Sequence, residues 1–176
     1  MIFSALTCLE QLMDINEESC HRIMHYKELI EYISKRAVKD EELSQNKIYC
    51  SELLAIVIQN SAHGRKKFGE INSLDKFLKV LTQEKYREKF SLDDIEYVGN
   101  IFNIICSILF EEENKETFYK LNGIEISIKF FDCHQLRLNT IKLLDVAIMN
   151  MPESCKSFIN SNGLKYIFPF LILKVI

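Results

Sequence analysis

The sequence has few residues that interrupt helices, and it has no tryptophan. Its 176 residues include only five glycines and two prolines. A fold built from short strands needs frequent turn signals, so this scarcity argues against an all-β architecture and predicts an all-α protein. The six cysteines form no Cys-x-x-Cys pair. We therefore expect free thiols in a reducing compartment and no disulfide framework.

Several functional signatures are also absent. The chain has no Gly-rich dinucleotide fingerprint, no Walker loop and no serine-centred nucleophile elbow. No apolar run reaches the roughly 18 residues that suggest a membrane span. The net charge is −3 and the basic residues are interspersed with acids, unlike the basic face of a nucleic-acid binder. We expect no enzyme activity, no catalytic residues, no cofactor, no membrane contact and no direct nucleic-acid contact.

One short cluster has the residue types of a metal site. Cys20, His21 and His25 follow the pattern Cys-His-x-x-x-His, and two histidines four residues apart on a helix can bind zinc. A complete zinc site needs further ligands with good geometry. Cys133 and His134 lie more than a hundred residues further along the chain. We interpret the histidines as helix-surface residues and expect no metal.

The chain does contain an internal repeat. Segments 63–78, 113–128 and 153–168 align in register, and 19–33 is a weaker relative. The steps between their anchor positions are 45, 50 and 40 residues, which bracket the roughly 40–47 residue period of armadillo and HEAT repeats. The anchor positions are Ile23, Phe68, Phe118 and Phe158.

Long apolar segments complete the repeat. They occupy 43–60, 92–110 and 135–150, and residues 2–15 resemble the end of an equivalent segment. Each unit predicts a short helix, a tight joint, a medium helix, a linker and a long helix, which favours armadillo over HEAT. We predict an all-α, armadillo-like alpha-alpha superhelix, a right-handed solenoid of about four repeats. Residues 1–176 would form a single array with approximate repeats 1–38, 39–83, 84–132 and 133–176.

The joint between the short and medium helices carries a turn signal. Gly123 and Gly163 each follow an asparagine, and Asn-Gly is a strong turn dipeptide. We expect both glycines to adopt positive φ and so to end one helix and start the next. The phenylalanine anchor and the apolar residue six positions later should clamp the two helices together.

A basic stretch, Ala-His-Gly-Arg-Lys-Lys-Phe-Gly-Glu at 62–70, raises two alternatives. A phosphate-binding loop would need its glycines at fixed spacing after a strand. The other repeats keep the phenylalanine of this stretch and lose its charges, which favours a structural joint with surface charge. The remaining alternative is a local basic contact site at Arg65, Lys66 and Lys67.

The long helices supply the candidate binding surface, because the third helices of an armadillo stack line its concave groove. In 92–110, the polar residues Glu96, Asn100, Asn103 and Ser107 recur at steps of 4, 3 and 4 and should share one face. This face is either a solvated inner wall or a ladder of amides and carboxylates, with Glu52, Glu96 and Asp145 placed to meet basic side chains. The candidate groove residues are Lys47, Ser51, Glu52, Glu96, Asn100, Asn103, Asn139 and Lys142.

Three stretches together resemble the beta-catenin-like protein 1 family of nuclear armadillo proteins. They are NKIYCSELLAIVIQNSAHGRKKFGEINSLDKFLKVL at 46–81, NIFNIICSILFEEENKETFYKLNGIEI at 100–126 and IKLLDVAIMNMPESCKSFINSNGLKYIFPFL at 141–171. Residues 4–15 match more loosely. The resemblance spans nearly the whole chain and includes both joints and long helices, but no catalytic motif.

This resemblance implies a function. It implies a non-enzymatic scaffold of the pre-mRNA splicing machinery in the nucleus, associated with the NineTeen complex, that binds basic nuclear-localisation-type segments of splicing factors. The alternatives are an armadillo-type nuclear transport adaptor or a general protein-interaction module. Importin-alpha-like adaptors carry regularly spaced Trp and Asn on the third helix, and the absence of tryptophan counts against the adaptor.

The family's members are roughly threefold longer than this chain, so we expect a fragment of a longer protein. The last residues are strongly apolar, and a solenoid end needs a polar cap. We expect an exposed apolar patch at Phe168, Phe170, Leu171 and Leu173. Such a patch also makes a homo-oligomer an outcome to test.

Overall fold

The computed structural model describes residues 2–83 and 90–172, and within these ranges there is no β-strand. None of the helices in these ranges is long and apolar enough to cross a membrane. The α-helices are α1 (Ile2–Ile15), α2 (Glu17–His25), α3 (Lys27–Val38), α4 (Gln45–Gln59), α5 (Ala62–Gly69), α6 (Ile71–Leu81), α7 (Leu92–Ile108), α8 (Glu112–Lys120), α9 (Gly123–Ile128), α10 (Arg137–Ile148), α11 (Pro152–Asn160) and α12 (Leu164–Ile172), with two 3-10 turns between α9 and α10.

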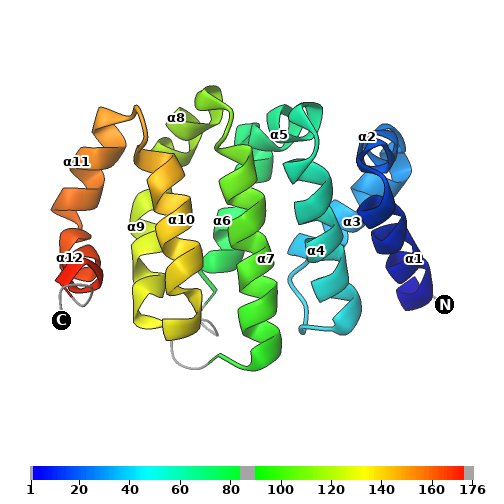
Figure 1. Ribbon diagram of the computed structural model, residues 1–176, viewed down its shortest axis with the longest axis horizontal. Coiled ribbons are helices and arrows are strands. Elements are labelled where there is room, and N and C mark those ends of the chain that lie inside the picture. Colours follow the sequence, from blue (N-terminus) through cyan, green and yellow to red (C-terminus); the bar gives the residue numbers. More distant parts are fainter. Residues whose placement is uncertain (1, 84–89, 173–176) are drawn as a thin grey trace.

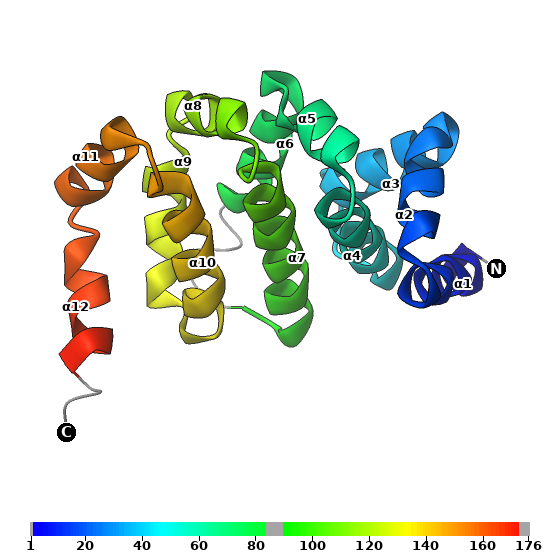
Figure 2. The same ribbon diagram turned by 45° about the horizontal axis from the view of Figure 1, so that its top comes forward.

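The helices recur in the predicted order of short, medium and long. The long helices α4, α7 and α10 stand side by side, and α1 precedes them in the same row (Figure 1). The medium helices α3, α6 and α9 form a second row behind them, and the short helices α2, α5, α8 and α11 lie along one edge (Figures 1 and 2). The all-α, armadillo-like architecture is therefore confirmed, while the number and boundaries of the repeats stay predictions.

The joints differ from the prediction in one respect. Neither Gly123 nor Gly163 has positive φ; the preceding Asn122 and Asn162 do, at 56° and 58°. Asparagine is one of the few residues other than glycine that enters the left-handed region at low cost. The Asn-Gly dipeptide correctly marked each joint, but the asparagine, and not the glycine, adopts the positive φ.

The glycines are instead required by close packing. A Cβ atom built on Gly123 would lie 2.3 Å from the ring of Phe118, and one on Gly163 would lie 2.2 Å from the ring of Phe158. Phe118 is fully buried. The anchor phenylalanine of the short helix thus lies directly against the first turn of the medium helix. Of the apolar residues six positions after the anchors, Leu74 and Ile124 are buried as the predicted clamp requires, whereas Leu164 is 39% exposed and does not fit it.

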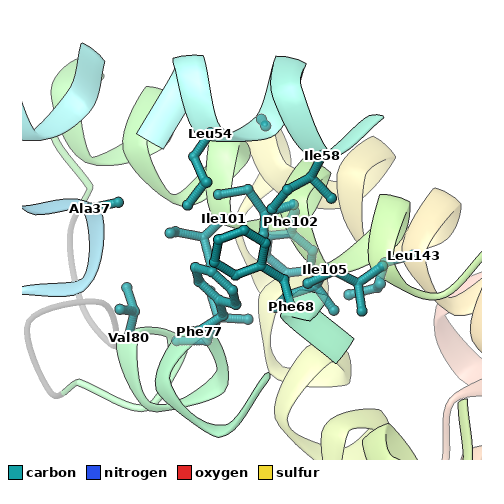
Figure 3. Close-up of a cluster of buried hydrophobic side chains, with 14 of the residues drawn as sticks. Ala37, Leu54, Ile58, Phe68, Phe77, Val80, Ile101, Phe102, Ile105 and Leu143 are labelled. Atoms are coloured by element: carbon teal, nitrogen blue, oxygen red, sulfur yellow. The ribbon is translucent and has the colours of Figure 1, made fainter. Parts of the chain in front are cut away.

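One continuous core runs through the array. Phe68 of α5 and Phe77 of α6 are buried with their ring centroids 6.2 Å apart. Figure 3 shows side chains from several helices converging around these rings. The labelled side chains are Ala37, Leu54, Ile58, Phe68, Phe77, Val80, Ile101, Phe102, Ile105 and Leu143.

The C-terminal helix leaves apolar side chains in solvent, as predicted. Phe168 is 52% exposed and Phe170 39% exposed. The two other residues of the predicted patch are not tested, because the side chain of Leu171 and the whole of Leu173 lie outside the part of the chain that the structure describes.

Candidate protein-binding face

The exposed side of α4, α7 and α10, which we call the third-helix face, is held together by contacts between neighbouring helices. The Asn100 amide of α7 donates to Ser51 Oγ of α4 at 3.2 Å. At one end of the same two helices, Gln45 Nε2 lies 3.3 Å from Asp93 Oδ2. On the other side of α7, Cys106 Sγ lies 3.9 Å from the carbonyl oxygen of Lys142 of α10. These contacts bring residues from three predicted repeats onto one surface.

The stripe predicted on α7 is confirmed for most of its length. Glu96 and Asn103 are exposed, and Asn100 is half-buried because its amide reaches across to α4. Ser107, the last member of the stripe, is buried. A ligand can therefore meet the Glu96 carboxylate and the Asn103 amide on α7, with Asn100 between them.

Lys47 was wrongly placed on this face. Its side chain is only 1% exposed, and its ammonium donates to the carbonyl oxygens of Lys39 at 2.6 Å and Glu41 at 3.4 Å. The ammonium also lies 4.9 Å from the ring centre of Tyr97. Carbonyl oxygens just beyond the C-terminus of α3 carry partial negative charge, so they and the ring compensate the buried cation.

Ser51 was also wrongly placed among solvent-facing residues. It is fully buried, and its hydroxyl donates to the carbonyl oxygen of Ile48 at 2.6 Å while accepting from Asn100. A serine hydroxyl that bonds within its own helix can be buried at little cost. Ser51 is therefore a contact between α4 and α7 and does not reach a ligand.

The exposed stripe of α4 lies in a different register from the predicted one. Gln45, Tyr49, Glu52, Ile56 and Gln59 recur at steps of 4, 3, 4 and 3, and all are exposed or half-buried. Only Glu52 belongs to both sets. The sequence signal that could have identified this stripe is Tyr49, an aromatic residue with a polar tip that often stands at a wet surface.

Tyr49 extends the face towards α1. Its ring and that of Phe3 meet edge to face with centroids 4.8 Å apart. Phe3 is 46% exposed. This aromatic pair was not predicted from the sequence, because a contact between α1 and α4 joins residues that are far apart in the chain.

The stripe of α10 is present but carries mixed charge. Asn139 is half-buried beside Gly99 of α7, whereas Lys142 and Asp145 are exposed. Between α7 and α10, burial raises the pKa of the Cys106 thiol; the nearby Lys142 ammonium lowers it and the Asp145 carboxylate raises it. Cys106 is therefore held as a neutral thiol at neutral pH.

The third-helix face has an excess of acidic groups. Its exposed or half-buried carboxylates come from Glu52, Asp93, Glu96 and Asp145, against the single cation of Lys142 among the described residues of these stripes. Four carboxylates on three adjacent helices create a negative potential that attracts basic segments. The face is thus suited to a cationic ligand.

The three residues of the predicted basic site differ in exposure and in partners. Arg65 is half-buried, with its Nε 2.9 Å from Glu111 Oε1 and its Nη1 2.9 Å from the carbonyl oxygen of Gln59. Lys66 is exposed and Lys67 is half-buried on the same helix, α5. Arg65 therefore belongs to the contact between α5 and the segment before α8, as expected of a structural joint, and α5 lies at the edge of the array rather than on the third-helix face (Figure 1).

Comparison with known proteins identifies the family. The family model described as "Catenin-beta-like, Arm-motif containing nuclear" matches residues 1–175. This chain belongs to that family. It is 30% identical over 171 residues to the beta-catenin-like protein 1 homolog of Schizosaccharomyces pombe, and 28% identical over 175 residues to beta-catenin-like protein 1 of Mus musculus and of Homo sapiens.

These alignments cover 95% to 97% of this catenin-beta-like chain but only 30% to 31% of each relative. The chain thus spans about a third of the length of the curated relatives it matches. The family description is of nuclear Arm-motif proteins, which agrees with the repeated helices and with the expected nuclear localisation.

The cysteine and histidine cluster of this catenin-beta-like chain is not arranged as a metal site. Cys20 is buried, whereas His21 and His25 are exposed. The His25 ring stacks on that of His63, with centroids 6.4 Å apart. Among the residues that the structure describes, no three His, Cys, Asp or Glu side chains are grouped as metal ligands.

Proposed function

We propose that this chain is part of a non-enzymatic nuclear scaffold of the pre-mRNA splicing machinery, associated with the NineTeen complex. In this proposal the third-helix face binds basic, nuclear-localisation-type segments of splicing factors. The observation that carries the proposal is the excess of carboxylates over cations on α4, α7 and α10. The family membership supports the nuclear setting.

The side chains of the face suit an extended basic peptide. Asn103 can both donate to and accept from a ligand backbone, because a primary amide has two N–H groups and a carbonyl oxygen. Glu52 and Glu96 can pair with lysine or arginine side chains, each contributing roughly 0.2–1 kcal/mol at a solvated surface. The pair of exposed Phe3 and half-buried Tyr49 can pack against the aliphatic stem of such a side chain.

The test is a titration of the chain with a fluorescein-labelled basic peptide from a Myb-type splicing factor, followed by fluorescence anisotropy at low and high salt. We expect binding that weakens as salt is raised. Glu96→Gln should weaken it about 1.4- to fivefold, from the loss of one ion pair of the size given above. Asn103→Ala should weaken it about two- to tenfold, from the loss of one hydrogen bond. Glu116→Gln on α8 is the matched control, since it removes an exposed carboxylate away from the face.

Equal affinity in Glu96→Gln, Asn103→Ala and the control would place the site elsewhere on the chain. Absence of salt dependence would refute an electrostatic mode of binding altogether. Because Glu96 and Asn103 are exposed and bond to no other helix among the described residues, a loss of binding in these variants would not reflect unfolding.

A further inference from the structure

A second surface lies on the other side of the array, between the medium helices α3 and α6. A cavity of about 230 Å³ opens there. Water occupies about 30 Å³ per molecule in the liquid, so this cavity has room for one leucine or phenylalanine side chain. Its lining residues are Ser34, Lys35, Val38, Phe68, Ser73, Lys76 and Phe77.

The floor of the cavity is apolar. The rings of Phe68 and Phe77, whose centroids lie 6.2 Å apart, form it together with Val38. Both rings are labelled at the centre of Figure 3. The rim serine from α3, Ser34, already donates its hydroxyl to the carbonyl oxygen of Ile30 at 2.6 Å. The floor therefore offers hydrophobic contact and little hydrogen bonding.

The rim of the cavity is positively charged. Lys76 has no carboxylate within ion-pair distance among the described residues, and the neighbouring Asp75 pairs with Lys79 at 2.6 Å. Lys35 pairs with Glu31 at 3.6 Å, but its side chain is 80% exposed, and such a pair contributes little. Both ammonium groups therefore remain available to an incoming anion.

We propose that this cavity is a docking site for an acidic peptide with one large apolar residue. The apolar side chain would enter the cavity and contact Phe68 and Phe77, while flanking carboxylates would pair with Lys35 and Lys76. The charge of the rim selects an acidic partner, and the apolar floor selects a peptide over a nucleic acid. The site is separate from the third-helix face and prefers the opposite charge, so the two proposals can fail independently.

The test uses the full chain and a fluorescein-labelled peptide with the core Glu-Asp-Glu-Phe-Asp-Glu. We expect the peptide to bind, and its affinity to fall about tenfold or more when its phenylalanine is replaced by serine, since the buried aromatic side chain supplies most of the apolar contact. Lys76→Glu should weaken binding about three- to tenfold. Ser73→Leu should weaken peptide binding at least as much as Lys76→Glu does. The larger leucine side chain would fill the cavity while leaving Lys35 and Lys76 in place.

Lys156→Glu on α11 is the matched control, since it makes the same change in net charge at an exposed position away from the cavity. Equal losses in Lys76→Glu and Lys156→Glu would overturn the proposal in favour of unspecific attraction. Equal affinity for the phenylalanine and serine peptides would also overturn it. An absence of peptide binding would overturn it as well. Sedimentation showing that Lys76→Glu dissociates a dimer would also overturn it, because a second copy of the chain would then cover the cavity.

The basic peptide that tests the third-helix face shows whether a variant affects one site or both. Ser73→Leu should leave its affinity unchanged. If Ser73→Leu weakened both peptides equally, the variant would have disturbed the fold; in that case Lys76→Glu, whose side chain is exposed, decides the outcome alone.

Discussion

Gly123→Ala adds a single methyl group at the joint between α8 and α9, and the structure predicts that the protein cannot accommodate it. The new Cβ would lie 2.3 to 2.5 Å from three carbon atoms of the Phe118 ring. Real Cβ atoms make contacts at about 3.5–4.0 Å. The Phe118 ring is fully buried, so either the ring or the first turn of α9 must move by roughly 1 Å.

Two terms decide the magnitude. Inserting a methyl group into a well-packed core typically costs about 1–3 kcal/mol. Replacing glycine by alanine inside a helix gives back up to about 1 kcal/mol, although Gly123 is the first residue of α9 and gains less. We expect a net loss of about 0.5–3 kcal/mol, which for a chain of this size lowers Tm by about 1–12 °C.

Thermal unfolding followed by circular dichroism measures this loss. Gly99→Ala is the matched control, because its Cβ would meet only Asn139 Nδ2, at an ordinary 3.7 Å; this variant should be neutral or slightly stabilising. Phe118→Leu combined with Gly123→Ala should cost less than the sum of the single changes, because the smaller side chain removes the clash. A Gly123→Ala protein as stable as Gly99→Ala would refute the close-packing explanation.

Three further predictions concern the joint, a buried thiol and the basic stretch. Asn122→Ala should lower the free energy of unfolding by about 1 kcal/mol while Asn122→Gly should not, since alanine is strained at positive φ; urea unfolding compares them. Burial raises the pKa of the Cys50 thiol to about 11, although the Arg36 guanidinium lowers it in part. As the pH rises, Cys50 therefore loses its proton in the unfolded chain before it does so in the folded one. The free energy of unfolding should fall by about 1 kcal/mol between pH 9 and 10, and less steeply in Cys50→Ala. Arg65→Met should cost roughly 1–3 kcal/mol by leaving Glu111 and a backbone carbonyl unpaired, whereas Lys66→Glu should leave Tm unchanged.

Much of the architecture could be predicted from the sequence. The long segment predicted at 92–110 is α7 (Leu92–Ile108), and the one predicted at 2–15 is α1. The anchors Phe68, Phe118 and Phe158 are all buried. These predictions succeeded because helix periodicity and the spacing of the anchors are local properties that repeat along the chain.

The candidate binding face was predicted less well. Glu96 and Asn103 are exposed as expected, but Lys47 and Ser51 are buried. Their polarity suggested a solvent-facing stripe, whereas one satisfies its charge beyond the end of α3 and the other bonds within its own helix and to Asn100. Whether a polar residue in an almost wholly apolar helix is exposed or satisfied internally depends on the partners that the tertiary structure brings to it.

The sequence by itself determined that this chain forms helices in a repeated order, where the joints lie and which aromatic residues hold them. Only the tertiary structure decided which side of α4 meets solvent, because successive residues on a helix are separated by about 100° and neighbouring helices leave a narrow exposed stripe. A shift of one residue in that stripe exchanges a buried side chain for an exposed one. The contacts of α4 with other repeats, such as Ser51 with Asn100 and Tyr49 with Phe3, fix that register, and they join residues that lie far apart in the chain.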